Sequence, residues 1–124
     1  MKFALCIISL LGLTLTQAHA DEPIGGKYFS SENFTTTATI ISAANNVNGA
    51  HLRSVVMLGN AYLAFVPPLG SGGTTRVMLG GATGAPPAHL PYPMYLPTGW
   101  SVTAVPNSGS ANVYATYDLN GAIN

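Results

Sequence analysis

The amino-acid sequence predicts an all-β fold, a single antiparallel β-sandwich or jelly roll of about six to eight short strands. Apolar and polar residues alternate with a period of two in most runs after Phe34. Turns rich in glycine, proline and asparagine separate these runs, and no helical periodicity of useful length occurs after residue 20. The chain after residue 20 is long enough for one domain with a two-layer core.

Residues 1–20 have the pattern of a signal peptide. A basic residue, Lys2, is followed by an apolar stretch over residues 3–15 and by Ala18-His19-Ala20, a small-x-small cleavage site. The apolar stretch is too short to span a bilayer. The pattern therefore predicts a mature chain that begins at Asp21, with a periplasmic or extracellular location and no stable membrane anchor after cleavage.

Residues 21–33 (DEPIGGKYFSSEN) are predicted to form a flexible N-terminal arm ahead of a β-sandwich domain over residues 34–124. The arm holds three of the four acidic residues of the mature chain and a Gly-Gly pair. Two interpretations remain open. The arm is either a frayed terminus, or it docks on a neighbouring subunit as an added strand through Ile24, Tyr28 and Phe29.

The first half of the domain is predicted to contain three strands. Residues 34–42 alternate threonine with apolar residues, as a half-buried strand does. A turn follows at residues 45–49, where asparagine and glycine accept positive φ. Residues 52–58 and 61–66 are the next two strands, and the two-residue loop Gly59-Asn60 between them predicts a β-hairpin.

The second half is predicted to contain three further strands. Residues 74–79 form the first, and the glycines and prolines of residues 80–93 then predict a long irregular surface segment. Alternation resumes over residues 100–104 and 112–119, which predicts the last two strands. Residues 106–110 connect them.

The charge of the mature chain is low. Three basic residues stand against four acidic residues, a net charge of −1: Lys27, Arg53 and Arg76 against Asp21, Glu22, Glu32 and Asp118. No basic patch is present, so we expect no nucleic-acid partner. Little charge repulsion opposes self-association. The single cysteine, Cys6, lies in the leader, so stability must come from core packing or oligomerisation rather than disulfides.

Two stretches of the chain resemble strand-and-turn sequences of small jelly-roll proteins of phage virions and tails. They are SAANNVNGA at residues 42–50 and LPTGWSVTAVPNSGSANVYATYDL at residues 96–119, less than half of the chain. The resemblance implies a structural or attachment role without a cofactor. The leader departs from that family, whose virion proteins are assembled inside the cell. No functional residue is carried over from it.

This domain has few residues that could carry out acid-base chemistry or bind a metal. After Asn33 the chain has one carboxylate, Asp118, and two histidines, His51 and His89. Catalytic and metal sites are usually built from clustered titratable groups. We therefore predict a non-catalytic protein with no metal and no cofactor. The remaining enzymatic alternative is a small hydrolase that uses His51 and Asp118, although no Gly-x-Ser-x-Gly motif is present.

The candidate ligand- or partner-binding residues are Tyr92, Tyr95 and Trp100. The first two belong to a proline-rich segment, HLPYPMYLP at residues 89–97, and Trp100 follows the next turn. Prolines stiffen a loop, and aromatic rings offer flat contact area for a sugar or a protein. The alternative is that Tyr95, Leu96 and Trp100 cap the core. Tyr92, between two prolines, is the one expected outside the core.

These observations predict an exported, non-catalytic β-sandwich protein with a structural or self-assembly role at or outside the cell envelope. Its expected partner is a second copy of itself or another surface protein. Low charge, no disulfide and the strand edges of such a fold favour this role. A monomeric module that binds a glycan or a peptide is the first alternative, and a small hydrolase is the second.

Overall fold

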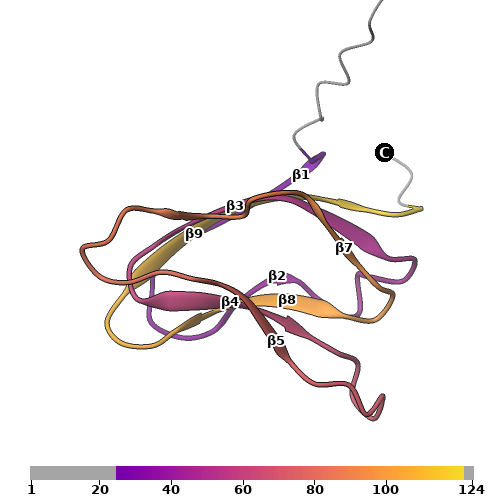
Figure 1. Cartoon of the computed structure of the whole chain (residues 1–124). Coiled ribbons are helices and arrows are strands. Elements are labelled where there is room, and N and C mark those ends of the chain that lie inside the picture. The colour runs from indigo at the N-terminus through magenta and orange to yellow at the C-terminus, as the bar shows by residue number, and fades with distance from the viewer. Residues whose placement is uncertain (1–24, 122–124) are drawn as a thin grey trace, which may run out of the picture.

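Two antiparallel β-sheets packed face to face make up the fold in the computed structural model, which describes residues 25–121 (Figure 1). These residues form nine strands and no helix, so none of them forms a helix that could cross a membrane. The all-β sandwich prediction is confirmed. The signal peptide predicted at residues 1–20 lies outside the described residues. The strands are β1 (Lys27–Phe34), β2 (Ala38–Ile41), β3 (Ala50–Leu58), β4 (Ala61–Val66), β5 (Arg76–Gly80), β6 (Ala88–His89), β7 (Met94–Leu96), β8 (Ser101–Pro106) and β9 (Ala111–Leu119).

The strand order is that of a jelly roll. The first sheet, sheet A, has the order β1-β9-β3-β6, with β7 also paired to β3, and the second, sheet B, has the order β2-β8-β4-β5. With β6 and β7 taken as one interrupted strand, the first strand pairs with the last, the second with the second last, and so on inward. Such pairing is that of one long hairpin rolled into two sheets, the jelly-roll arrangement.

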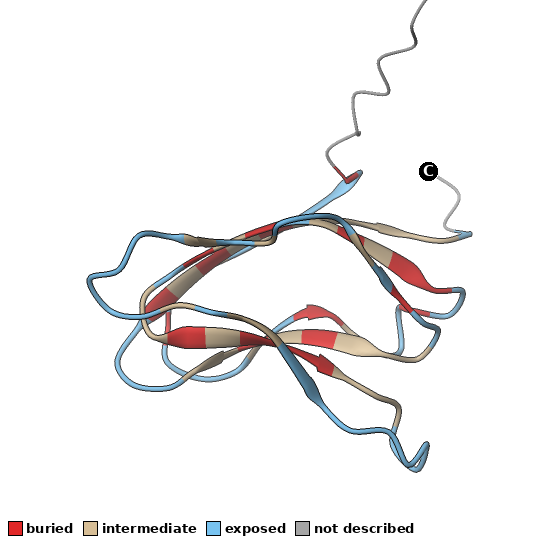
Figure 2. Ribbon diagram, viewed as in Figure 1, coloured by how far each residue is buried: buried red, intermediate tan, exposed pale blue. Residues whose placement is uncertain are grey.

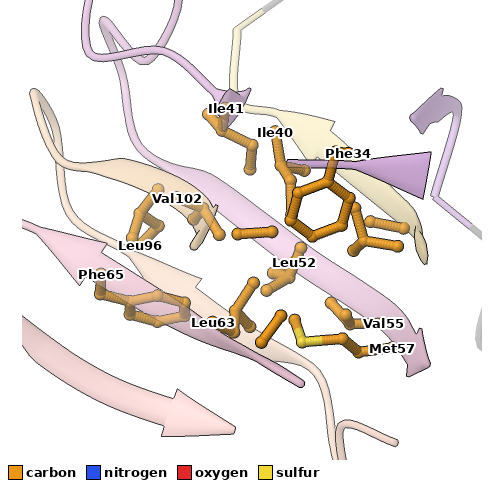
Figure 3. Close-up of a cluster of buried hydrophobic side chains, with 14 of the residues drawn as sticks. Phe34, Ile40, Ile41, Leu52, Val55, Met57, Leu63, Phe65, Leu96 and Val102 are labelled. Carbon is orange, nitrogen blue, oxygen red and sulfur yellow. The ribbon is translucent and has the colours of Figure 1, made fainter. Parts of the chain in front are cut away.

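The core lies between the sheets and follows from the alternation of each strand. Leu52 and Met57 of β3 face Leu63 of β4 and Val102 of β8, and all four side chains are fully buried (Figure 3). Buried residues alternate with more exposed ones along the long strands (Figure 2). Each such aliphatic side chain contributes about 1.5–3 kcal/mol by leaving water. This core is what the period-two pattern of the sequence predicts.

The predicted β-hairpin at Gly59-Asn60 is wrong, although both of its strands are present. β3 belongs to sheet A and β4 to sheet B, so the two residues carry the chain from one sheet to the other. In a hairpin the flanking residues would share a face, but Leu58 is 38% exposed and Ala61 is fully buried. Asn60 bonds instead to the other crossing, between β8 and β9: its Nδ2 donates to Ser108 Oγ at 2.7 Å.

We expect Gly59→Ala to destabilise the fold by about 1–3 kcal/mol, because φ is +92° there and the added Cβ would lie 3.0 Å from the Ser110 carbonyl oxygen. Gly70→Ala is the control, since Gly70 also has positive φ (+79°) but nothing lies within 4 Å of its added Cβ. Urea denaturation of both variants separates backbone strain from steric contact. Equal losses of stability would show that the crossing between sheets imposes no packing constraint at Gly59.

The predicted flexible arm is wrong for residues 27–33. These residues belong to β1, which pairs antiparallel with β9 from Lys27 opposite Tyr117 to Phe34 opposite Ala111. Gly25 packs so closely on the Tyr117 backbone that an added Cβ would lie 2.5 Å from its nitrogen. The segment thus adds a strand to its own sheet and places Phe29 against the core. Residues 21–24 lie outside the described residues.

The strand predicted over residues 34–42 is also divided differently. Phe34 ends β1 in sheet A, residues 35–37 cross between the sheets, and β2 begins at Ala38 in sheet B. A run of alternating residues does not reveal such a crossing, because both parts keep one buried face. The segment predicted to be irregular at residues 80–93 is largely exposed, and it is irregular apart from Gly80, which ends β5, and the two-residue strand β6.

Candidate functional site

A groove of about 280 Å³ opens between two edge strands, β5 of sheet B and β7 of sheet A. The two strands lie at the edges of their sheets on the same side of the sandwich (Figure 1). The groove is lined by Phe65 of β4, Arg76 and Met78 of β5, Met94 and Tyr95 of β7, and Pro97 and Trp100 of the connection to β8.

A β-bulge in β5 shapes one wall of the groove. The register between β4 and β5 shifts, with Leu79 opposite Leu63 and Val77 opposite Ala64, so Met78 is the extra residue. A bulge bends its strand and redirects side chains. Arg76 lies opposite Phe65, a core residue, and therefore stands on the groove side of β5.

The opposite wall is a tight turn clamped by a buried asparagine. Trp100 N–H donates to the Pro97 carbonyl at 3.1 Å, and Gly99 has φ of +77°, the arrangement of a type II turn. Asn46 is fully buried, and its Nδ2 donates to the carbonyls of Pro97 (2.7 Å) and Trp100 (2.9 Å). The backbone carbonyl of Asn46 accepts from Gly99 N–H at 2.8 Å. Asn46 therefore positions the turn that carries Trp100.

The structure brings two of the three residues predicted to bind a partner, Tyr95 and Trp100, to the groove and leaves Tyr92 outside it. Tyr92 is 72% exposed in the connection between β6 and β7, as expected, but does not line the groove. Tyr95 is 55% exposed and lies beside His51, with ring centroids 5.3 Å apart. Trp100 lines the groove and packs against the core, and Leu96 is fully buried. The predicted cap thus holds for Leu96 and, in part, for Trp100.

The chemistry of the groove is that of an apolar floor with one cation at its edge. Phe65, Met78, Met94 and Trp100 supply apolar surface, and Arg76 is exposed. Among residues 25–121 the one ion pair joins Arg53 and Asp118, so Arg76 has no carboxylate partner there. Such a lining suits a large apolar side chain next to an anionic group.

Three of the residues that build this site lie outside the segment that the sequence singled out: Asn46, Arg76 and Met78. The predicted turn at residues 45–49 contains three asparagines, and nothing in the sequence distinguishes the buried one. Arg76 and Met78 alternate on a predicted strand, but the sequence does not show that this strand is an edge. The role of each of these residues in the groove follows only from the three-dimensional fold.

The two residues of the hydrolase alternative, His51 and Asp118, lie opposite each other on β3 and β9. His51 Nδ1 contacts Asn120 Oδ1 at 3.1 Å. Asp118 accepts from Gly26 N–H through Oδ1 and from Arg53 Nε through Oδ2, both at 2.7 Å. The carboxylate is thus bound to partners other than the imidazole. Among the described residues no three His, Cys, Asp or Glu side chains group as metal ligands would.

Asp118→Asn is expected to lower the free energy of unfolding at neutral pH by about 0.5–1 kcal/mol. This is the size expected for a surface ion pair, because the Arg53 and Asp118 side chains are 26% and 32% exposed. The Gly26 N–H first, and then Arg53, hold the pKa of Asp118 below its usual range. A lowered carboxyl pKa stabilises the fold above the unfolded value, about 3.9, and the effect disappears as pH falls through the folded value. Urea melts of both proteins should therefore converge in acid. A difference that persists well below pH 3.9 would contradict the ionic origin.

No protein-family model matches this chain, and neither a curated protein nor a solved structure does so. The inferences below therefore depend on the residues and their geometry.

Proposed function

We propose that this chain is an exported, non-catalytic binding domain whose groove receives an extended peptide segment. The segment presents a large apolar side chain to the groove and a carboxylate to Arg76. One observation carries the proposal: an apolar groove with an unpaired cation opens between two edge strands. The leader pattern at residues 1–20 supports export. The scarcity of titratable groups supports a non-catalytic role.

A peptide suits this groove better than a neutral glycan. Sugar hydroxyls both donate and accept hydrogen bonds, and the described lining holds no carboxylate or amide side chain to accept from them. A peptide can obtain its hydrogen bonds from strand edges instead. Within the described residues β5 pairs with β4 alone and β7 with β3 alone, so each leaves one edge open beside the groove. Adding a strand to such an edge is a common mode of peptide recognition.

The test uses the mature chain, beginning at Asp21, immobilised for selection from a displayed library of random peptides. Selected peptides are then titrated while the fluorescence of Trp100, the single tryptophan of the chain, is followed. We expect the selected sequences to share a large apolar residue next to an acidic residue or a terminal carboxylate. Their binding should change the Trp100 emission, because Trp100 lines the groove.

Arg76→Glu should weaken the selected peptides at least about tenfold, because a charge-assisted hydrogen bond is replaced by repulsion. Lys27→Glu is the matched control, since Lys27 is also an exposed cation on an edge strand, at the opposite side of sheet A. Equal weakening in both variants would show a non-specific charge effect and contradict the proposal. Strong signals on a glycan array with no selected peptide would assign the groove to sugars instead.

A structural, self-associating role is the second candidate function. A different surface favours it, the outer face of sheet B.

A further inference from the structure

The outer face of sheet B is apolar along β4 and at the residues Val77 and Val105 beside it, where a solvated sheet face is normally polar. Strand β4 reads AYLAFV: Leu63 and Phe65 point into the core, so Tyr62, Ala64 and Val66 point outward, although Ala64 is only 2% exposed. The register places Val105 of β8 opposite Tyr62 and Val77 of β5 opposite Ala64. A strand that is apolar on both faces is typical of one covered on both faces.

This outer face also carries no charge. Among residues 25–121 the charged side chains are Lys27, Glu32, Arg53, Arg76 and Asp118. Four of them belong to strands of sheet A, and Arg76 stands on the groove side of β5. The polar residues on the outer face of sheet B are neutral: Thr39, Ser101 and Thr103. The two outer faces of the sandwich therefore differ sharply in character.

We infer that the outer face of sheet B is a self-association surface, covered by the same face of a second copy of this chain in a two-fold symmetric dimer. Two such faces meet without burying an unpaired charge, which would be costly. Two copies of the outer face of sheet A would bury charged side chains against each other, because that face carries Glu32, Arg53 and Asp118. An isologous contact of one face with itself closes into a dimer.

The size of the face sets the expected strength of the contact. The six residues of β4 and the four strands of sheet B span roughly 20 Å by 20 Å. Two copies would then bury on the order of 800 Å² in total, below the size of most stable specific interfaces. We therefore expect dimerisation that depends on protein concentration rather than a permanent dimer.

The test is sedimentation equilibrium of the mature chain across a concentration series, with Val77→Asp as the disrupting variant. Val77 is 63% exposed on the outer face, so a charge there leaves the monomer core intact. Val47→Asp is a closely matched control, because Val47 is also 63% exposed but lies in the loop between β2 and β3. Thermal melts verify that both variants fold, and Thr103→Lys on β8 replaces Val77→Asp if it does not.

We expect the parent chain and Val47→Asp to approach twice the monomer mass as concentration rises, and Val77→Asp to need at least tenfold more protein to do so. A parent chain that stays monomeric throughout would overturn the inference. A dimer that Val77→Asp and Thr103→Lys leave unchanged would place the contact elsewhere and would overturn it too. Growth beyond a dimer would refute the two-fold arrangement.

Discussion

Asn46→Asp is expected to destabilise the fold by about 3–5 kcal/mol and to loosen the groove, because the change buries a carboxylate against two carbonyl oxygens. Asn46 Nδ2 donates to Pro97 O and Trp100 O, and aspartate has no hydrogen to donate to either. Asn46 Oδ1 is buried without a hydrogen-bond partner, and among the described residues no cation contacts it. Urea denaturation followed by Trp100 fluorescence measures both effects.

The control for this change is Asn45→Asp in the same turn. Asn45 is exposed, and its hydrogen bonds to Ser42 use the backbone N–H, which the substitution retains. We expect its stability to stay within about 0.5 kcal/mol of the parent chain. If Asn46→Asp were equally mild and left the Trp100 emission unchanged, Asn46 would not be what holds the wall of the groove.

Leu63→Ala is expected to cost about 2–5 kcal/mol, because it opens a cavity in the middle of the sandwich. Leu63 is fully buried on β4 and packs in the cluster formed by both sheets (Figure 3). In a domain of this size each kcal/mol lowers the melting temperature by roughly 4–8 °C. The chain has a single cysteine, so no disulfide within it offsets the loss. Calorimetry and urea denaturation should report it together.

Leu69→Ala removes the same side-chain atoms from a fully exposed position in the loop between β4 and β5. We expect a change within about 0.5 kcal/mol there. Comparable losses in the two variants would mean that Leu63 is not part of a cooperative core. The pair therefore tests the assignment of inward and outward residues to β4.

The sequence pattern predicted most strands of this domain correctly. Residues 61–66 form β4 as predicted, and the final run, predicted over residues 112–119, is β9 with one more residue at its start. The turn before Trp100 is also confirmed, with Gly99 at positive φ. These features are local, because alternation and turn residues act over a few neighbouring positions.

The sequence did not predict correctly which strands pair with each other. Gly59-Asn60 suits a two-residue hairpin, yet packing of β3 and β4 in opposite sheets buries both of their apolar faces in one core. The same burial explains β1: Phe29 packs on the core and the strand covers the edge of β9. The sequence predicted an arm at residues 21–33 because the charged residues and glycines of this segment were given more weight than its short alternation of polar and apolar residues.

In the candidate site, too, the sequence predicted the local features but not the contacts between distant residues. Aromatic and proline content pointed to the segment from Tyr92 to Trp100, and two of its three predicted residues line the groove. Arg76 and Met78 come from a distant part of the chain, and Asn46 fixes the turn from a third. No spacing in the sequence relates these residues.

By itself, then, the sequence determined the all-β class, the approximate positions of most strands and the shortage of catalytic groups. The physical reason is that each follows from composition or from the burial of one face of a strand. Only the tertiary structure decided which sheet holds each strand, which edges stay open and which face of sheet B lacks charge. Those properties depend on contacts between residues far apart in the chain, where packing of both sheets overrides local turn preference.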